Sequence, residues 1–258
     1  MTRFSANLGF LWADRPLPDA VRAAYAAGFD AVECHWPYDV NATEVKAALD
    51  DTGLQMLGLN TRRGDVPGGD NGLSAMPHRT DEARAAIDEA LAYARVLGTR
   101  NIHVMAGFSD HPDAHATFVE NLRYACDAGA ADGITMLIEP LNAFDAPGYA
   151  LRDTDHAAQI IADVGADNLK LMFDCYHVGR TEGDVLGRLR PLLPLIGHIQ
   201  FAAVPDRGAP DHGDVDYDTV FAEIAALGWD APLGAEYKPG GDTDATLGWL
   251  RTMRAVEA

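Results

Sequence analysis

The feature that most constrains the fold is a regular alternation of short apolar segments and amphipathic segments along the 258 residues. The apolar segments read as strands at 4–10, 31–34, 55–59, 101–105, 135–139, 169–173, 196–201 and 232–236. The segments that follow them read as helices at 17–27, 41–51, 80–97, 112–131, 153–164, 182–190, 217–227 and 243–254. Strands separated by helices, each strand mostly apolar, are typical of a parallel sheet covered by helices.

Glycines punctuate this alternation in a repeated way. The segment 80–97 places its apolar residues on one helical face, at Ala83, Ile87, Ala90, Leu91 and Ala94. Gly98 follows its last turn, where glycine commonly ends a helix. The same order of helix, glycine and strand recurs at Gly28, Gly53, Gly133 and Gly228. Eight such units predict one α/β domain over residues 1–258, a (β/α)8 TIM barrel. An open doubly wound sheet is the alternative, weakened because no G-x-G-x-x-G follows the first strand.

The composition indicates which classes of partner the protein can have. The formal charge is −19, from 39 acidic and 20 basic residues, so the surface repels phosphate backbones and no nucleic-acid partner is expected. Three cysteines without regular spacing indicate a reduced, intracellular protein. No apolar run approaches 18 residues and the first residues lack a signal-peptide pattern, so we expect a cytoplasmic protein without a membrane partner. Oligomeric state stays open, a homo-oligomer included.

Four polar residues close four consecutive expected strands near the end of the chain. They are Glu139, Asp174, Gln200 and Glu236. A carboxylate at the end of a buried strand is costly unless something pairs with it. Each one alone could cap the next helix or pair with a nearby cation. Catalytic groups of a barrel come from the carboxyl ends of its strands, and these four strands are neighbours, so we expect the four side chains to converge on one point.

The converging set predicts a metal-assisted proton transfer. Three carboxylates in one site repel each other and have raised pKa values unless a cation neutralises them. An all-oxygen ligand set favours Mg²⁺ or Mn²⁺ over Zn²⁺. Glu139 and Glu236, facing each other across that metal, could take a proton from one substrate carbon and return one to the next. The metal would act as a Lewis acid toward the enediolate oxygen.

Four further residues are candidates for substrate binding. His177 follows Asp174 by three residues, and Arg207 lies in the long loop after the seventh strand, where its guanidinium could hold a carboxylate. His103 lies within the fourth strand, and Lys238 follows the eighth. Their ordinary alternatives are a structural histidine, a surface arginine, a core histidine and an exposed lysine.

Other positions carry weaker signals. His198, two residues before Gln200, is expected one layer deeper in the barrel, and Glu33 is a pocket acid or the partner of an arginine. Cys175 has no evident helix N-terminal position and is expected to be inert. Two long loops, 60–79 and 202–216, follow strands and are expected at the catalytic face.

These residues stand in motifs that resemble the hydroxypyruvate isomerase family, within the xylose-isomerase-like TIM barrel superfamily. The motifs are FSANLGF, GFDAVE, GLSAMP, IHVMAG, IEPLN, FDCYH, GHIQFAAVPDRGAP and AEYKP, and they cover nearly the whole chain. The resemblance implies isomerisation of hydroxypyruvate to tartronate semialdehyde. It also implies Glu139 and Glu236 as the proton-transfer pair, and Glu139, Asp174, Gln200 and Glu236 as metal ligands. His177 and Arg207 match positions that related epimerases use to bind substrate oxygens.

Several alternatives remain open beside this reading. The chain could be a 2-oxo-tetronate isomerase or a keto-sugar 3-epimerase on the same barrel. Phosphodiester hydrolysis is disfavoured by the charge of −19 and by a glutamine at position 200, and a non-catalytic sugar-acid sensor would keep the pocket without turnover. Phe144, Gly179 and His78 stand where family members often carry arginine, glutamine and glycine. These departures bear on substrate identity more than on reaction type.

Overall fold

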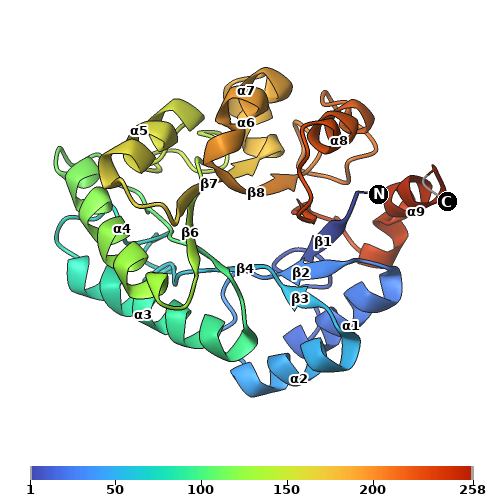
Figure 1. Ribbon diagram of the computed structural model, residues 1–258, viewed down its shortest axis with the longest axis horizontal. Coiled ribbons are helices and arrows are strands. Elements are labelled where there is room, and N and C mark those ends of the chain that lie inside the picture. The colour runs from blue at the N-terminus through green and yellow to red at the C-terminus, as the bar shows by residue number, and fades with distance from the viewer. Residues whose placement is uncertain (1, 257–258) are drawn as a thin grey trace.

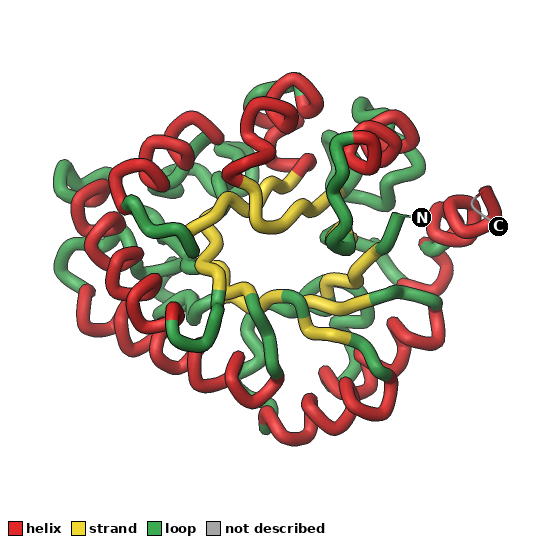
Figure 2. The backbone as a smooth tube through the Cα atoms, in the orientation of Figure 1, coloured by secondary structure: helices red, strands yellow, loops and turns green. Residues whose placement is uncertain are grey.

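The computed structural model describes residues 2–256 and shows a ring of parallel strands surrounded by helices (Figure 1). Figure 2 shows the same two layers, with the strands inside and the helices outside. The strands are β1 (Phe4–Asn7), β2 (Ala31–Glu33), β3 (Gln55–Met56), β4 (Gly58–Asn60), β5 (Asn101–His103), β6 (Thr135–Ile138), β7 (Leu169–Asp174), β8 (Ile196–Phe201) and β9 (Leu233–Ala235). The α-helices are α1 (Leu17–Ala27), α2 (Ala42–Thr52), α3 (Thr80–Leu97), α4 (Ala114–Ala130), α5 (Thr154–Val164), α6 (Cys175–Thr181), α7 (Val185–Leu192), α8 (Tyr217–Ala226) and α9 (Gly248–Val256).

The strands pair in the order β3-β2-β1-β9-β8-β7-β6-β5-β4, and each pair is parallel. The two ends of this order, β3 and β4, are consecutive in the chain and are separated by Leu57. Leu57 N–H donates to the carbonyl of Val32 at 2.7 Å, and Cys34 N–H donates to the carbonyl of Gly58 at 3.1 Å. These bonds close the sheet, so the predicted TIM barrel is confirmed.

The third predicted strand, 55–59, differs from its prediction. It is divided into β3 and β4, because β3 pairs with β2 whereas β4 pairs with β5 on its other side. The chain turns from one neighbour to the other at Leu57. The two short strands together therefore replace one of the eight predicted strands.

The predicted helix 182–190 is wrong in its bounds. Two helices are present instead, α6 directly after β7 and then α7. Asp174 caps α6, because its Oδ1 accepts from the N–H of Tyr176 at 2.8 Å, and Gly183 separates the helices with a positive φ of 84°. Cys175 is thus the first residue of a helix, contrary to expectation. Burial nevertheless raises the pKa of its thiol well above its ordinary value, which disfavours the reactive thiolate.

The predicted glycine punctuation is confirmed. Gly28, Gly53 and Gly98 adopt the left-handed conformation directly after α1, α2 and α3, with φ of 90°, 73° and 73°. Gly133 and Gly228 likewise have positive φ, 64° and 84°, shortly after α4 and α8. A side chain at such positions strains the backbone, which explains why glycine recurs there.

An aromatic cluster fills the space between the barrel and its last two helices. Phe4 of β1 is fully buried and contacts three rings edge-on, with centroid distances of 5.8 Å to Phe201, 5.2 Å to Phe221 and 5.1 Å to Trp249. These rings come from β8, α8 and α9. The cluster therefore joins the first strand to the last helices of the described chain.

Replacing Phe4 by Ala is expected to lower the free energy of unfolding by about 3–5 kcal/mol, because it leaves a cavity among three rings. Chemical denaturation measures the change. Phe144→Ala is the matched control: this ring is 71% exposed, so the change should stay within about 0.5 kcal/mol. Equal stability of the two variants would contradict the packing described.

The three cysteines are free and buried. Among residues 2–256, no helix has the length and apolar character needed to cross a bilayer.

Candidate active site

The four side chains predicted at neighbouring strand ends come from adjacent strands of the barrel. Asp174 ends β7 and pairs in register with Gln200 of β8, whereas Glu139 and Glu236 follow β6 and β9 directly. All four are buried. One oxygen each of Glu139, Asp174 and Glu236, and one ring nitrogen of His177, lie within 4.8 Å of one another. Parallel strand order brings the carboxyl ends of β6 to β9 side by side, which accounts for the convergence.

The three carboxylates differ in their electrostatics. Burial, together with the carboxylates of Glu236 and Asp174, raises the pKa of Glu139 well above its usual range. Burial also raises the pKa of Asp174 to about 7. Burial would raise the pKa of Glu236 too, but the Arg207 guanidinium and the His35 imidazole outweigh it and hold that pKa below its usual range. Without a cation, the cluster therefore retains protons at neutral pH.

Three buried oxygens of this cluster accept no hydrogen bond from the residues described: Glu139 Oε1, Asp174 Oδ2 and Gln200 Oε1. Gln200 Nε2 donates to Glu33 Oε1 at 2.9 Å, which leaves the amide oxygen free for another partner. Buried polar atoms without partners are costly. Oxygen atoms from carboxylates and an amide are the donors that hard divalent cations prefer. Glu139, Asp174, Gln200 and Glu236 therefore fit a divalent cation.

His177 is oriented as a hydrogen-bond donor. Its Nδ1 accepts from the backbone N–H of Asn142 at 3.0 Å, and burial lowers the pKa of the ring to about 3, so the ring is neutral at pH 7. A neutral ring that accepts at Nδ1 carries its proton on Nε2. That nitrogen lies 3.7 Å from Glu139 Oε1 and 3.7 Å from Asp174 Oδ2. The tautomer favours donation to an oxygen over coordination of a metal.

His103 lies at the same end of the barrel. It is the last residue of β5, and its Nδ1 is 3.5 Å from Glu139 Oε2. Neither ring nitrogen has a hydrogen-bond partner among the residues described. Burial lowers the pKa of His103 to about 4, so this ring is also neutral. His103 therefore offers a second neutral imidazole beside the carboxylate cluster.

Arg207 brings a half-buried positive charge to the cluster, with 13% of its side chain exposed. Its guanidinium carbon lies 4.9 Å from the centroid of the Phe10 ring and 5.0 Å from that of the Tyr176 ring. Its Nη2 donates to Glu236 Oε2 at 2.5 Å and lies 4.0 Å from Asp174 Oδ2. Both rings are close enough to the guanidinium for a cation–π contact. The predicted loop arginine therefore lies within the site.

The backbone at Arg207 is unusual. Its φ is 60°, in the left-handed region that non-glycine residues rarely occupy, at a cost of about 1–3 kcal/mol. Two hydrogen bonds hold this conformation: Arg207 N–H donates to the carbonyl of Ala203 at 2.9 Å, and Lys238 N–H donates to the carbonyl of Arg207 at 2.8 Å. The side chain of Lys238 is exposed. Lys238 thus supports the loop through its backbone, while substrate contact by its ammonium group stays a prediction.

Glu33 and His198 form a layer below the cluster. Glu33 Oε1 accepts from Gln200 Nε2 and, at 3.2 Å, from Asn7 Nδ2, while Glu33 Oε2 pairs with His198 Nε2. The deeper placement of His198 is confirmed. The alternative of an arginine partner for Glu33 is wrong, because amide, imidazole and hydroxyl groups hold its carboxylate.

Sequence reasoning missed four polar residues at the site. Asn7 ends β1 and donates through Nδ2 to Glu236 Oε1 at 3.0 Å, and His35 Nε2 pairs with the same oxygen at 2.9 Å. Asn142 donates to His177, and Asp145 Oδ2 accepts from the hydroxyl of Tyr176 at 2.8 Å. Only Asn7 had a local signal, because it closes a strand as the predicted ligands do.

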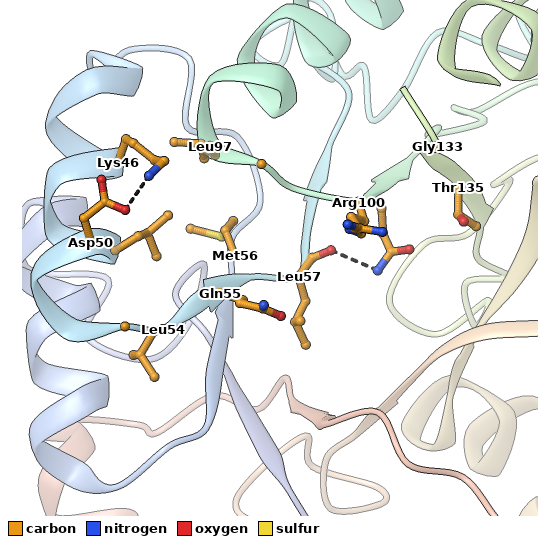
Figure 3. Close-up of a pocket in the computed structure, with 14 residues that line it drawn as sticks. Lys46, Asp50, Leu54, Gln55, Met56, Leu57, Leu97, Arg100, Gly133 and Thr135 are labelled. Atoms are coloured by element: carbon orange, nitrogen blue, oxygen red, sulfur yellow. Dashed lines mark hydrogen bonds and ion pairs between the residues drawn. The ribbon is translucent and has the colours of Figure 1, made fainter. Parts of the chain in front are cut away.

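A pocket of about 680 Å³ lies at the opposite end of the barrel (Figure 3). Its walls are the starts of strands β3, β5 and β6 and the glycines that end α2 and α3. Two polar pairs lie in it (Figure 3): Lys46 with Asp50, and the side-chain amide of Asn101 with the carbonyl of Leu57. This is the end of a barrel associated with stability, and we assign no chemistry to it.

Comparison with known proteins identifies the family. The family model described as xylose isomerase-like TIM barrel matches residues 21–253. The chain belongs to this family. It is 45% identical to the 2-oxo-tetronate isomerase of Cupriavidus necator, over 97% of this chain and 98% of that protein. It is 39% identical to the hydroxypyruvate isomerase of Escherichia coli, over 98% of this chain and 100% of that protein.

A solved structure has a fold closely similar to that of this chain. The crystal structure of a family 2 AP endonuclease from Brucella melitensis superposes with a TM-score of 0.94 and 35% identity, covering 98% of this chain and 99% of that one. The full-length relatives named above are isomerases, and this xylose isomerase-like barrel is accordingly an enzyme of that class.

The structure shows the surroundings of Phe144, Gly179 and His78, the three residues that the resemblance marks as departures. The Phe144 ring is exposed and lies under the guanidinium of Arg180, 4.1 Å from its carbon to the ring centroid. A Cβ at Gly179 would come within 2.9 Å of the side chain of Val204, so this helix position is tightly packed. The His78 ring contacts that of His111 edge-on at 5.7 Å. Of the three, Phe144 is the one at the surface, against Arg180 of α6.

Proposed function

We propose that this barrel isomerises a short hydroxy-oxo acid through an enediolate, with hydroxypyruvate and tartronate semialdehyde as the leading pair. One observation carries the proposal: two glutamates from β6 and β9 converge, with Asp174 and Gln200 between them, on a cluster with unpaired oxygens. Two acid–base groups beside a small substrate can take a proton from one carbon and return one to the adjacent carbon.

The proton path uses the two glutamates in sequence. One carboxylate removes the proton from the carbon that bears the hydroxyl group, and the electrons pass into the enediolate. The other glutamate, protonated, gives its proton to the adjacent carbon, and the hydroxyl proton on the first carbon passes to the former carbonyl oxygen on the second. The first carbon thereby becomes the aldehyde and the second carries the hydroxyl group. Proton exchange with solvent then restores the starting protonation of the two glutamates. Glu236 and Glu139 would serve in either order, depending on the direction of the reaction.

The remaining residues orient the substrate. Nε2–H of His177 and the unpaired imidazole of His103 would donate to substrate oxygens, and the half-buried guanidinium of Arg207 would attract the substrate carboxylate. A divalent cation, Mg²⁺ or Mn²⁺, held by Glu139, Asp174, Gln200 and Glu236 would neutralise the carboxylates and polarise the substrate carbonyl.

A four-carbon acid is the second candidate. The relative from Cupriavidus necator, at 45% identity, is named for 2-oxo-tetronate, whereas the hydroxypyruvate isomerase of Escherichia coli is 39% identical. Both substrates share the hydroxy-oxo acid group on which the two glutamates would act. The proposed chemistry is therefore the same, and chain length is what the experiment has to separate.

The test is a substrate screen in D₂O followed by NMR. Hydroxypyruvate, 2-oxo-tetronate and a ketohexose are incubated with the protein and Mg²⁺, and parallel samples contain a chelator. We expect deuterium beside the carbonyl and the isomeric product for one of the two acids, with metal present. Turnover of the ketohexose alone would favour the epimerase reading, and deuterium uptake by none of the three would refute the proposal.

A further inference from the structure

One of the two proposed bases is held by hydrogen bonds on both of its oxygens. Glu236 Oε1 pairs with His35 Nε2 at 2.9 Å and accepts from Asn7 Nδ2 at 3.0 Å, while Oε2 accepts from Arg207. Glu139, by contrast, has an oxygen without any hydrogen-bond partner among the residues described. The rotation of the Glu236 carboxylate is thus fixed, and two of its three partners, Asn7 and His35, have no role in the chemistry proposed above.

The position of the His35 ring depends on the absence of a side chain at Gly9. A Cβ on Gly9 would lie 2.0 Å from Nδ1 of His35, far inside van der Waals contact. The ring is also fixed by two aromatic neighbours, Phe10 with centroids 5.1 Å apart and edge-on, and Trp36 at 4.9 Å. Gly9 has no positive φ to explain its identity. Its role is therefore to leave room for the imidazole.

The same glycine orients the second donor. The backbone N–H of Gly9 donates to Oδ1 of Asn7 at 2.9 Å, so the amide of Asn7 turns its Nδ2 toward Glu236. That Nδ2 also donates to Glu33 at 3.2 Å, which links the layer below to the catalytic carboxylate. Gly9 consequently sets the geometry of both groups that hold Glu236 Oε1.

We infer that Asn7, Gly9 and His35 form a positioning cluster for Glu236. The cluster fixes the plane of the carboxylate, so that the oxygen facing the substrate carbon keeps one orientation through the reaction. It acts through Glu236 and does not contact the reacting atoms, and the inference rests on the isomerase function proposed above. Groups that orient a carboxylate ligand or base by hydrogen bonds commonly contribute about 10–100-fold to activity or metal affinity.

The test compares Gly9→Ala, His35→Leu and the double variant. Each single change is expected to lower kcat by about 10–100-fold with KM changed less than about threefold, because the base is misplaced while substrate-binding groups are intact. Both single changes remove the same hydrogen bond, so the double variant should be no slower than the slower single variant.

His35→Gln keeps an N–H donor and is expected to recover part of kcat. Gly241→Ala is the matched control, because nothing lies within 4 Å of a Cβ there, and it should behave as wild type.

A second readout is independent of turnover. Mn²⁺ affinity, measured by calorimetry, should fall about 10–100-fold in Gly9→Ala and His35→Leu, with thermal unfolding temperatures within a few degrees of wild type. Wild-type kcat and Mn²⁺ affinity in both variants would overturn the positioning cluster while leaving the isomerase intact. If wild type isomerises none of the acids, the proposed function fails, and the Mn²⁺ affinities still decide whether the cluster holds Glu236.

Discussion

Replacing Glu139 by Gln, or Glu236 by Gln, is expected to lower kcat for isomerisation by about 10²–10⁴-fold, because an amide of the same shape cannot accept the proton. The fold should persist, because glutamine has the shape of glutamate, Glu139 already holds a proton in the metal-free protein, and the amide oxygen at position 236 can still accept from Asn7 or Arg207. NMR in D₂O adds a sharper readout. Each variant keeps one base, so Glu139→Gln and Glu236→Gln should exchange deuterium into opposite isomers of the substrate while neither completes the isomerisation.

Glu120→Gln is the control for these variants. Glu120 is exposed on α4, and its replacement should leave kcat unchanged. Wild-type activity in either the Glu139 or the Glu236 variant would contradict the scheme with two bases. Loss of exchange into both isomers in both variants would instead indicate that the substitutions act through loss of the metal.

Removal of divalent cations by a chelator is expected to abolish activity, and the affinity for Mn²⁺ is expected to rise with pH. Burial raises the pKa of Asp174 to about 7 and that of Glu139 well above its usual range, so both groups hold protons that a cation must displace. Below pH 7 the affinity should therefore fall by about tenfold per pH unit for each proton displaced. As pH rises through 7, the contribution of Asp174 should level off.

Calorimetric titration of Mn²⁺ at pH 6, 7 and 8, in buffers of different ionisation enthalpy, measures both the affinity and the number of protons released. Asp174→Asn supplies the comparison, because its amide has no proton to lose in this range, and its proton release should be smaller. An affinity that does not change between pH 6 and pH 8 would show that the carboxylates are already ionised in the metal-free protein.

Much of the fold follows from local sequence pattern. The spacing of the strands, the five glycines that follow helices and the polar residue at each strand end are all visible as local patterns in the sequence. Parallel order then brings Glu139, Asp174, Gln200 and Glu236 together without further information, because the carboxyl ends of adjacent strands share one end of a barrel. The placement of Arg207 beside them agrees with the same rule applied to the loop after β8.

Other parts could not be predicted because they depend on contacts between distant residues. His35 pairs with a carboxylate 201 positions away, and its ring fits only against a glycine that no periodic pattern singles out. Asn142 sets the tautomer of His177 through a backbone N–H, which sequence cannot reveal. Helix α6 begins directly after β7, because Asp174 caps it. Asp174 was predicted only as a metal ligand, so its second use as a helix cap was missed.

The pairing of β1 with β9, with Phe4 set against Phe201 and Trp249, has a consequence for synthesis on the ribosome. The first strand has only one of its two sheet neighbours until more than 230 residues have been made, since Leu233 of β9 is its partner on the other side. Nascent chains therefore expose one edge of β1 and an aromatic surface for most of translation. Chaperones that shield exposed strand edges would therefore have to bind β1 longer than the other strands.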